Sequence, residues 1–237
     1  MDATGYTTLN RQTGLLREMQ TVANNIANSA TTGYRSEGLI FSEHVSRIEG
    51  GPSLSMATAN VRHTSLSLGT MTQTNAPLDI AIQGDGFFLI ETAEGERLSR
   101  AGSFALSAEG DLVTQDGHRV LDAGGAPIFI PPNSGEVGVS ADGTISADGQ
   151  LLGQLGVVAP ADSQSLVREG GVLFRTDDDV EPVATPNLRQ GFLENSNVDP
   201  IIEMTRMIEV QRAYEMGQSF LDAENERIRD AVKTLMR

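Results

Sequence analysis

Cysteine and tryptophan are absent from this 237-residue chain, and lysine occurs once, as Lys233. Without cysteine, the protein has no disulfide, no thiolate nucleophile and no cysteine-based zinc site. Aromatic residues make up only 5% of the chain, so any hydrophobic core must consist mainly of aliphatic side chains. No apolar run approaches the length that a membrane-spanning helix needs, and the sequence therefore predicts no membrane insertion.

Basic residues are also scarce, because 17 lysines and arginines are outnumbered by 32 acidic residues, for a net charge of −15. The imbalance is uneven. Residues 1–35 carry +1 and residues 201–237 carry −1, which leaves −15 on the middle of the chain. Near-neutral ends can pack together in number, whereas an acidic middle repels its copies. With no basic patch to neutralise phosphates, the sequence predicts no nucleic-acid partner.

Motifs that bind nucleotides, metals or substrates are missing as well. The chain has neither a P-loop nor a Gly-x-Gly-x-x-Gly turn, and Ser103 lacks the glycine spacing of a nucleophile elbow. The histidines, His44, His63 and His118, lie far apart in polar stretches typical of surface positions. Recurring Asp-Gly pairs match hairpin turns and lack the closing glutamate of a calcium loop. We therefore predict no catalytic, cofactor-binding or metal-ligating residues, no cofactor and no enzymatic activity.

One alternative from another functional class stays open at this point. Among 32 acidic residues, nothing in the sequence singles out or excludes a carboxylate pair at the spacing of a glycoside hydrolase. A β-rich enzyme or ligand-binding module on a helical oligomerisation stalk would fit the same composition. It would require a concave site with clustered polar groups.

The C-terminal stretch from Pro200 to Arg237 has the pattern of one long helix. Asp199 suits the N-cap and Pro200 suits the first helical position. One apolar stripe repeats every seven residues, but a second stripe in the adjacent register contains a glycine and a glutamate. The helix is therefore expected to need partners. The two stripes are Met207, Tyr214, Leu221, Ile228 and Leu235, and Val210, Gly217, Glu224 and Ala231.

A second helical pattern covers residues 4 to 28, near the N-terminus. Leu9, Leu16 and Ala23 repeat every seven residues, and Met19 and Ile26 fill the alternate position. The pattern ends in the turn-rich segment 28–33. The two terminal helices can pair with each other in an antiparallel hairpin, or present their stripes to other copies of the chain. The sequence leaves both options open.

The middle of the chain changes from a helical to a strand-like period. Residues 36–76, rich in Ser, Thr, Gly and Met, are expected to form an extended arm or connection. Residues 77–190 alternate short apolar runs with Asp-Gly and Glu-Gly turns, which predicts an all-β domain of hairpins. The expected fold class is α+β. Its segments are an N-terminal assembly helix with its following turn at 1–35, the arm at 36–76, the central β domain at 77–190, and a C-terminal assembly helix at 191–237. The two long helices would pair in a coiled-coil-like assembly domain.

Blocks at both ends and in the middle of the chain resemble the bacterial flagellar rod and hook protein family. Asn24-Asn25-Ile26-Ala27-Asn28, followed by Thr31-Thr32-Gly33-Tyr34-Arg35, resembles the family signature after its N-terminal helix. Residues 75–88 and 99–104 are similar to the start of the family's β domain, although Ser99 and Ala101 stand where threonine and a polar residue are more usual. Residues 191–199 and 207–215 are similar to its C-terminal block.

The resemblance implies a structural axial subunit, with the terminal helices forming an inner tube and the β domain outside. The modest length and single middle domain favour a rod subunit over a hook subunit. The short acidic passage from Val172 to Leu188 favours the proximal rod, with the distal rod as the alternative. Implied partners are other copies of the chain, other flagellar rod subunits and the flagellar type III export apparatus. The implied location is the basal body, where the rod crosses the periplasm.

The N-terminus, Met1 to Gly5, lacks the basic and apolar segments of a secretory signal. This agrees with the export without signal-peptide cleavage that the resemblance implies. The asparagines of the signature are expected to fix the helix end through amide hydrogen bonds. Together the stripes and the signature predict an assembly interface of Leu9, Leu16, Met19, Asn24, Asn25, Ile26, Asn28, Met207, Gln211, Tyr214, Leu221, Ile228 and Leu235.

Overall fold

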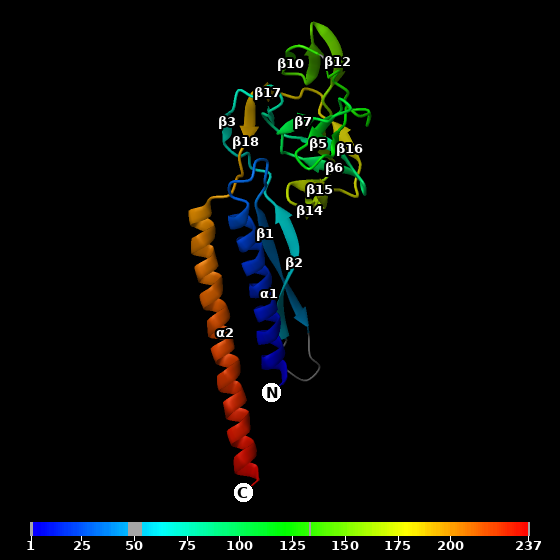
Figure 1. Ribbon diagram of the computed structural model, residues 1–237. Helices are drawn as coiled ribbons and strands as arrows, with labels where there is room; N and C mark the ends of the chain where they lie inside the picture. Colours follow the sequence, from blue (N-terminus) through cyan, green and yellow to red (C-terminus); the bar gives the residue numbers. More distant parts are fainter. Residues whose placement is uncertain (1, 47–53, 133, 237) are drawn as a thin grey trace. The chain divides into compact units, whose positions relative to one another are not determined.

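The computed structural model in Figure 1 describes residues 2–46, 54–132 and 134–236. The chain divides into two compact units, each built from segments that are far apart in sequence. The first, which we call the helical unit, contains Met1–Ala27, Glu37–Ser65 and Asp199–Arg237. The second, the β unit, contains Asn28–Ser36 and Leu66–Val198. The signature segment after the first helix therefore lies in the β unit, although the sequence analysis grouped it with that helix.

Two long helices, α1 (Asp2–Ala27) and α2 (Pro200–Leu235), run antiparallel and contact each other in the helical unit (Figure 1). The Asp199 carboxylate caps α2 by accepting hydrogen bonds from the backbone N–H groups of Ile201, at 2.9 Å, and Ile202, at 3.3 Å. Pro200 at the first helical position has no N–H that needs a partner. The predicted pairing of the terminal helices is confirmed, as is the α+β class.

A long hairpin completes the helical unit. Strands β1 (Glu37–Ser46) and β2 (Leu54–Thr64) are antiparallel, with a bulge at Ile40/Phe41, and both strands contact α1. The segment that was expected to be an extended arm thus holds paired strands. Its sequence did not predict the pairing, because it shows no clear alternation of apolar and polar residues.

The β unit is formed by short antiparallel strands, as the recurring turn dipeptides predicted. In the described residues, nine strands form the main sheet, with the path β14–β15–β6–β5–β9–β8–β7 and with β13 and β16 attached through β5. The main-sheet strands are β5 (Phe87–Thr92), β6 (Gly95–Ser99), β7 (Phe104–Leu106), β8 (Leu112–Thr114), β9 (Arg119–Val120), β13 (Val157–Pro160), β14 (Val167–Gly170), β15 (Leu173–Arg175) and β16 (Val180–Pro182). A 3-10 turn, Ser163–Ser165, precedes β14.

Smaller sheets border the main one within the β unit. One has three strands, β10 (Val137–Val139), β11 (Thr144–Ala147) and β12 (Gln150–Gln154). Two others each pair an early strand with a late one. They are β4 (Ile80–Ile82) with β17 (Leu188–Gln190), and β3 (Met71–Gln73) with β18 (Phe192–Glu194). The end of the β unit is therefore joined by hydrogen bonds to its beginning.

Strand β5 is the centre of the core, because both of its faces are buried. Phe88 and Ile90 belong to one apolar cluster, in which the rings of Phe88 and Phe104 meet edge to face at 5.1 Å. Phe87 belongs to a second cluster, where its ring meets Phe174 at 5.8 Å. Edge-to-face packing is favourable for aromatic rings. The aromatic side chains of this core, although few, are thus used in packing on both faces of β5.

Candidate assembly surface

The contact between α1 and α2 is centred on residues of the weak stripe. Val210 is the buried residue of α2, and Gly217 lies against Gln12 of α1. The Gln12 Nε2 atom donates to the Tyr214 carbonyl at 3.0 Å, and Arg206 pairs with Glu18 at 2.9 Å. The glycine that weakened the stripe thus makes room for a polar side chain from the partner helix. These polar contacts and modest apolar burial hold the helix pair together.

The predicted interface residues fall into three classes of exposure. Asn25 is buried, whereas Leu9, at 53%, and Leu235, at 87%, are well exposed. The stripes are thus only partly covered by contacts within one chain, and a role in assembly remains a prediction. The half-buried residues are Met19, Ile26, Asn28, Met207, Tyr214 and Leu221, and the exposed ones also include Leu16, Asn24, Gln211 and Ile228.

An apolar stripe remains exposed on α1. Leu9, Leu16 and Ala23 repeat every seven residues and therefore lie on one side of the helix. The side that α1 turns inward is different, since it carries Gln12 and Val22, which are buried. The stripe that the sequence made most prominent on α1 is thus left open to solvent in the single chain.

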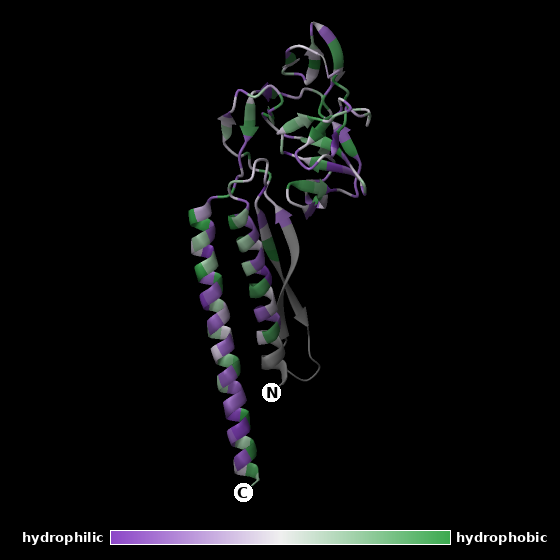
Figure 2. Cartoon of the chain, viewed as in Figure 1, coloured by the Kyte–Doolittle hydropathy of each residue, from purple (hydrophilic) through white to green (hydrophobic). Residues whose placement is uncertain are grey.

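The last turns of α2 extend past the start of α1 (Figure 1). Gln12 lies at the same level as Gly217. Because the helices are antiparallel and have the same rise per residue, Asp2, ten residues before Gln12, lies level with about Arg227, ten residues after Gly217. Beyond this level, Ile228, Val232 and Leu235 continue the side of α2 that carries Val210 and Gly217, because they are 18, 22 and 25 positions after Val210. Figure 2 shows hydrophobic residues between hydrophilic ones along this end of α2. We call residues 228–235 the α2 extension.

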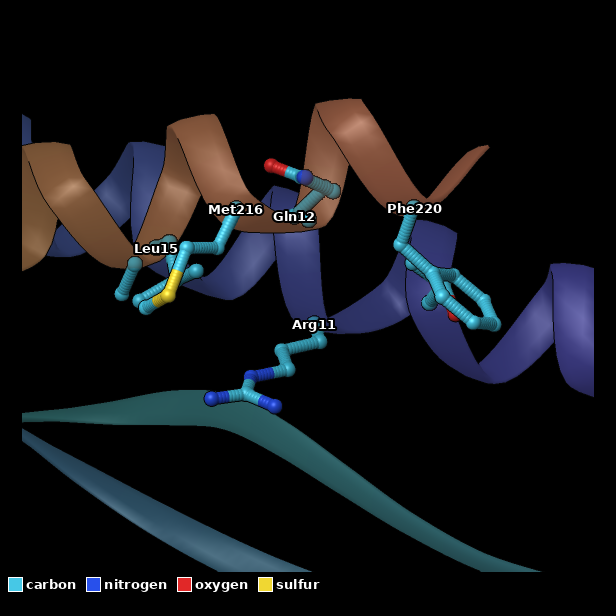
Figure 3. Close-up of a pocket in the computed structure, with 8 residues that line it drawn as sticks. Arg11, Gln12, Leu15, Met216 and Phe220 are labelled. Carbon is cyan, nitrogen blue, oxygen red and sulfur yellow. The ribbon is translucent and has the colours of Figure 1, made fainter. Parts of the chain in front are cut away.

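A shallow groove of about 390 Å³ runs along one flank of the helix pair (Figure 3). In Figure 3, Leu15 and Met216 lie close together, and Arg11 points away from α2 toward the hairpin strands. Met216 and Phe220 are 67% and 47% exposed. The groove has an apolar floor and no group positioned for catalysis. Its lining is Thr8, Arg11, Gln12, Leu15, Ala213, Met216, Gly217 and Phe220.

The asparagines of the signature have distinct local roles. Asn25 is 1% exposed, and its Nδ2 donates to the Glu37 carbonyl at 2.9 Å while its Oδ1 accepts from the Glu37 N–H at 3.0 Å. Asn25 thereby satisfies both backbone groups at the start of β1. In the β unit, Asn28 accepts from Thr31 Oγ1 at 3.2 Å within the turn after α1. Asn24 is exposed.

A buried ion cluster in the β unit was missed by sequence reasoning. The Glu194 carboxylate lies 2.9 Å from Arg35 Nη2 and 2.7 Å from Arg100 Nη2, and all three side chains are at most 3% exposed. Arg100 also donates to the carbonyls of Ile82, Gly84 and Gly86, at 3.0, 2.9 and 2.7 Å. Burial lowers the pKa of Arg35 to about 10, and Glu194 opposes that change. Burial likewise lowers the pKa of Arg100.

Packing fixes the signature segment beside this cluster. The Arg168 guanidinium lies 4.2 Å from the centre of the buried Tyr34 ring, and Arg168 Nη2 donates to the Arg35 carbonyl. Gly33 has a φ of +71°, and any Cβ there would overlap the backbone of Ala101. A glycine is therefore required at this position of the signature, both by its conformation and by the close approach.

The histidines and Ser103, which the sequence offered as possible catalytic or metal-binding groups, do not form a site in the part of the chain that the structure describes. His63 is exposed, His118 is half-buried, and Ser103 Oγ accepts a hydrogen bond from Gln115 at 3.2 Å. The side chain of His44 lies outside the described residues. Among the side chains that the structure describes, no three His, Asp or Glu are grouped to hold a metal ion. In that same part of the chain, neither helix is apolar enough over a sufficient length to cross a membrane.

Comparison with known families gives three matches along the chain. Residues 4–35 match the model described as flagella basal body rod protein. Residues 81–147 match the flagellar hook protein FlgE/F/G D1 domain, and residues 189–234 match the flagellar basal body rod FlgEFG protein C-terminal model. The matches include α1 with the signature segment, most of the main sheet, and β17, β18 and α2.

Individual relatives are similar over almost the full length. The flagellar basal-body rod protein FlgF of Caulobacter vibrioides is 39% identical over 99% of this chain and 98% of its own. FlgF of Mesorhizobium japonicum is 38% identical over 97% of this chain and 96% of its own. The flagellar basal-body rod protein FlgG of Bacillus subtilis is 32% identical, over 91% of this chain and 92% of its own.

Proposed function

Because the chain belongs to the flagellar basal-body rod protein family, as a FlgF-like structural subunit of the proximal rod, we propose that it polymerises through the faces of its helix pair that one chain leaves exposed. The FlgF relatives are 38% and 39% identical and the FlgG relative 32%, which supports the proximal assignment over the distal one. The chain is a structural subunit and not an enzyme. The helices, which the alternative hypothesis treated only as a stalk for an enzyme, are therefore the part of the chain that we propose carries its function.

The observation that carries this proposal is the apolar surface left on the helix pair after α1 and α2 have packed. Burying one large aliphatic side chain contributes about 1.5–3 kcal/mol. Association costs about 4–15 kcal/mol in lost motion, so several such residues must be covered together. A subunit surrounded by neighbours can cover them all, whereas a dimer cannot. The exposed residues are Leu9, Leu16, Ile201, Ile202, Met204, Ile208, Met216, Phe220, Ile228, Val232 and Leu235.

Charge supports the same arrangement. The two helical ends of the chain are close to neutral, and the acidic residues lie mainly between them. Packing many copies through their helices therefore brings little like charge together, whereas packing through the acidic middle would be opposed by repulsion. The partners are other copies of the chain and other rod subunits. The helices are proposed to line the inside of the rod, with the β unit outside them.

Export is the remaining part of the proposal. A subunit of a rod that crosses the periplasm must leave the cytoplasm. We infer that the flagellar type III export apparatus is the partner for this step, without signal-peptide cleavage. The absence of cysteine is compatible with passage as an unfolded chain, because no disulfide must form first.

Substitution of Leu16 tests the proposal. Leu16→Asp places a charge in the exposed stripe of α1, and Ser219→Asp places the same charge at an exposed polar position of α2 as a control. Both variants should be exported and should have the far-ultraviolet circular dichroism of the wild type. Basal bodies purified from cells carrying only Leu16→Asp should lack this subunit, and motility should be lost. Normal motility with Leu16→Asp would refute the proposed surface.

A further inference from the structure

The last part of the β unit joins segments that are scattered along the chain. Residues 188–197, which we call the closing segment, supply β17 and β18, the partners of β4 and β3. The Glu194 carbonyl accepts from the Gly33 N–H at 2.7 Å, and the Asn195 N–H donates to the Thr70 carbonyl at 2.8 Å. Asn197 Oδ1 accepts from the Ser36 N–H at 2.7 Å. The closing segment thus holds together parts of the chain that precede it by 106 residues or more.

Within this segment, Glu194 forms ion pairs with two buried arginines. One carboxylate oxygen contacts Arg35 and the other contacts Arg100, and the Gly69 N–H also donates to the first oxygen at 2.9 Å. Among the described residues, no second carboxylate forms an ion pair with either arginine. Removing one partner from a buried ion pair is strongly destabilising, because the remaining charge stays buried without compensation. Loss of Glu194 would leave both arginines buried without an ion-pair partner, and of the described carboxylates only the more distant Asp85 would still favour their charged forms.

The charge of Arg100 lies where β4 and β5 pack together, so it is buried when the core forms. Its guanidinium donates to the carbonyls of Ile82, Gly84 and Gly86, which connect β4 to β5. Next to it, a Cβ on Gly102 would overlap the Ile80 carbonyl oxygen, so the two backbones are in close contact. Strands β4 and β5 therefore cannot close around the core without burying the Arg100 charge.

We propose that Glu194 is a folding latch, and that its carboxylate must be in place before β4, β5 and β6 close around the core. The β unit then completes its fold only after the closing segment has joined the earlier strands. When the chain emerges N-terminus first, from a ribosome or through a channel, residues 66–187 therefore remain unfolded until the closing segment has also emerged. This inference concerns the folding of the β unit and is independent of how the helix pair assembles.

Folding kinetics of the full-length chain show whether the Glu194 ion pairs form before the folding transition state, as the latch requires, or only after it. Glu194→Gln keeps the size of the side chain and one acceptor oxygen, but it removes the charge and replaces the other oxygen with an NH2 donor. If the carboxylate is needed in the transition state, folding slows by about tenfold or more while unfolding changes by less than about threefold. Pulse-labelled hydrogen exchange at the amides of β5 and β6 reads this step separately from the helices. Glu109→Gln, in an exposed turn, is the control and should change neither rate. An unchanged folding rate with faster unfolding would overturn the proposal.

A second variant keeps the proposal testable if Glu194→Gln does not fold. The triple substitution Arg35→Met, Arg100→Met and Glu194→Leu removes all three charges and keeps apolar volume at each position. Buried ion clusters can be replaced in this way without loss of stability. The triple variant should fold faster than Glu194→Gln, because it has no buried charge to compensate, although the carbonyls of Ile82, Gly84 and Gly86 lose their donor. If it protects the amides of β5 and β6 no better than Glu194→Gln, the latch is not electrostatic and the proposal fails.

Discussion

Gln12 and Gly217 fit together across the helix pair. Gln12 Nε2 donates to the Tyr214 carbonyl at 3.0 Å, and it can do so because Gly217 has no Cβ. A Cβ at Gly217 would overlap this nitrogen and lie 3.0 Å from Gln12 Cδ. The obstacle is the far end of a flexible side chain, so it can move at the cost of the hydrogen bond.

This relationship predicts that the effect of substituting Gly217 depends on size. Gly217→Ala gains about 1 kcal/mol of helix propensity and loses one hydrogen bond worth about 1 kcal/mol, so stability should be almost unchanged. Gly217→Val should lower it by about 1–3 kcal/mol through overpacking. Urea unfolding followed by circular dichroism at the helical band measures both effects, with Ala223→Val at an exposed position of α2 as the control. Adding Gln12→Ala to Gly217→Val should restore at least part of the loss, and an equal or larger loss would contradict the steric explanation.

Asn25 is predicted to be essential for the junction between α1 and β1. Its amide forms two hydrogen bonds with the backbone of Glu37 and is almost fully buried. Asn25→Ala leaves that N–H and C=O without their partner, and each unsatisfied buried group costs about 1–3 kcal/mol. We expect a loss of about 2–4 kcal/mol in chemical unfolding. Gln20→Ala, at an exposed position of the same helix, should change stability by less than about 0.5 kcal/mol. Equal stabilities of the two variants would show that the Glu37 contacts contribute little.

The Asp199 cap gives a prediction for the start of α2. Its carboxylate accepts from two of the N–H groups that have no partner within the helix. Asp199→Ala should cost about 1 kcal/mol, measured as an earlier loss of helical circular dichroism on heating. Asp199→Asn retains an acceptor oxygen and should recover most of the difference. If Asn performs no better than Ala, the capping hydrogen bonds are not the source of the effect.

The sequence predicted the helices and the β class because both rest on local periodic signals. The seven-residue repeat of Met207, Tyr214 and Leu221 defined α2, and the Asp-Gly turns marked the hairpins. Periodicity did not reveal which stripe faces α1. The stripe that contains Val210 and Gly217 looked too weak for a coiled coil, yet these two residues form the centre of the contact. The fit of Gln12 against a glycine produces no periodic signal in the sequence.

The ion cluster could not be predicted for a related reason. Arg35, Arg100 and Glu194 are separated by many tens of residues, and each stands in a short, otherwise ordinary stretch. Each of them lies within a block that resembles the flagellar family, but a family block does not say which residues meet in space. For Asn25, the sequence predicted only part of the result. Its role in amide hydrogen bonding was expected, but its partner, Glu37, follows twelve residues later in a strand that the sequence did not reveal.

The α2 extension yields the last prediction. Ile228, Val232 and Leu235 continue the side of α2 that contacts α1, but they lie beyond the start of α1 and are 40%, 46% and 87% exposed. Because Ile228 lies near the exposed end of the helix pair and is 40% exposed, Ile228→Asp should leave the unfolding free energy of the monomer within about 0.5 kcal/mol of the wild type. Assembly should nevertheless be lost, because a neighbouring subunit that covers the extension would have to bury a carboxylate. Sedimentation of concentrated protein and the subunit content of basal bodies measure this, with Ala223→Asp as the control for added charge on α2. If both variants assemble like the wild type, the extension remains exposed in the rod and the contacts between subunits lie elsewhere on the helix pair.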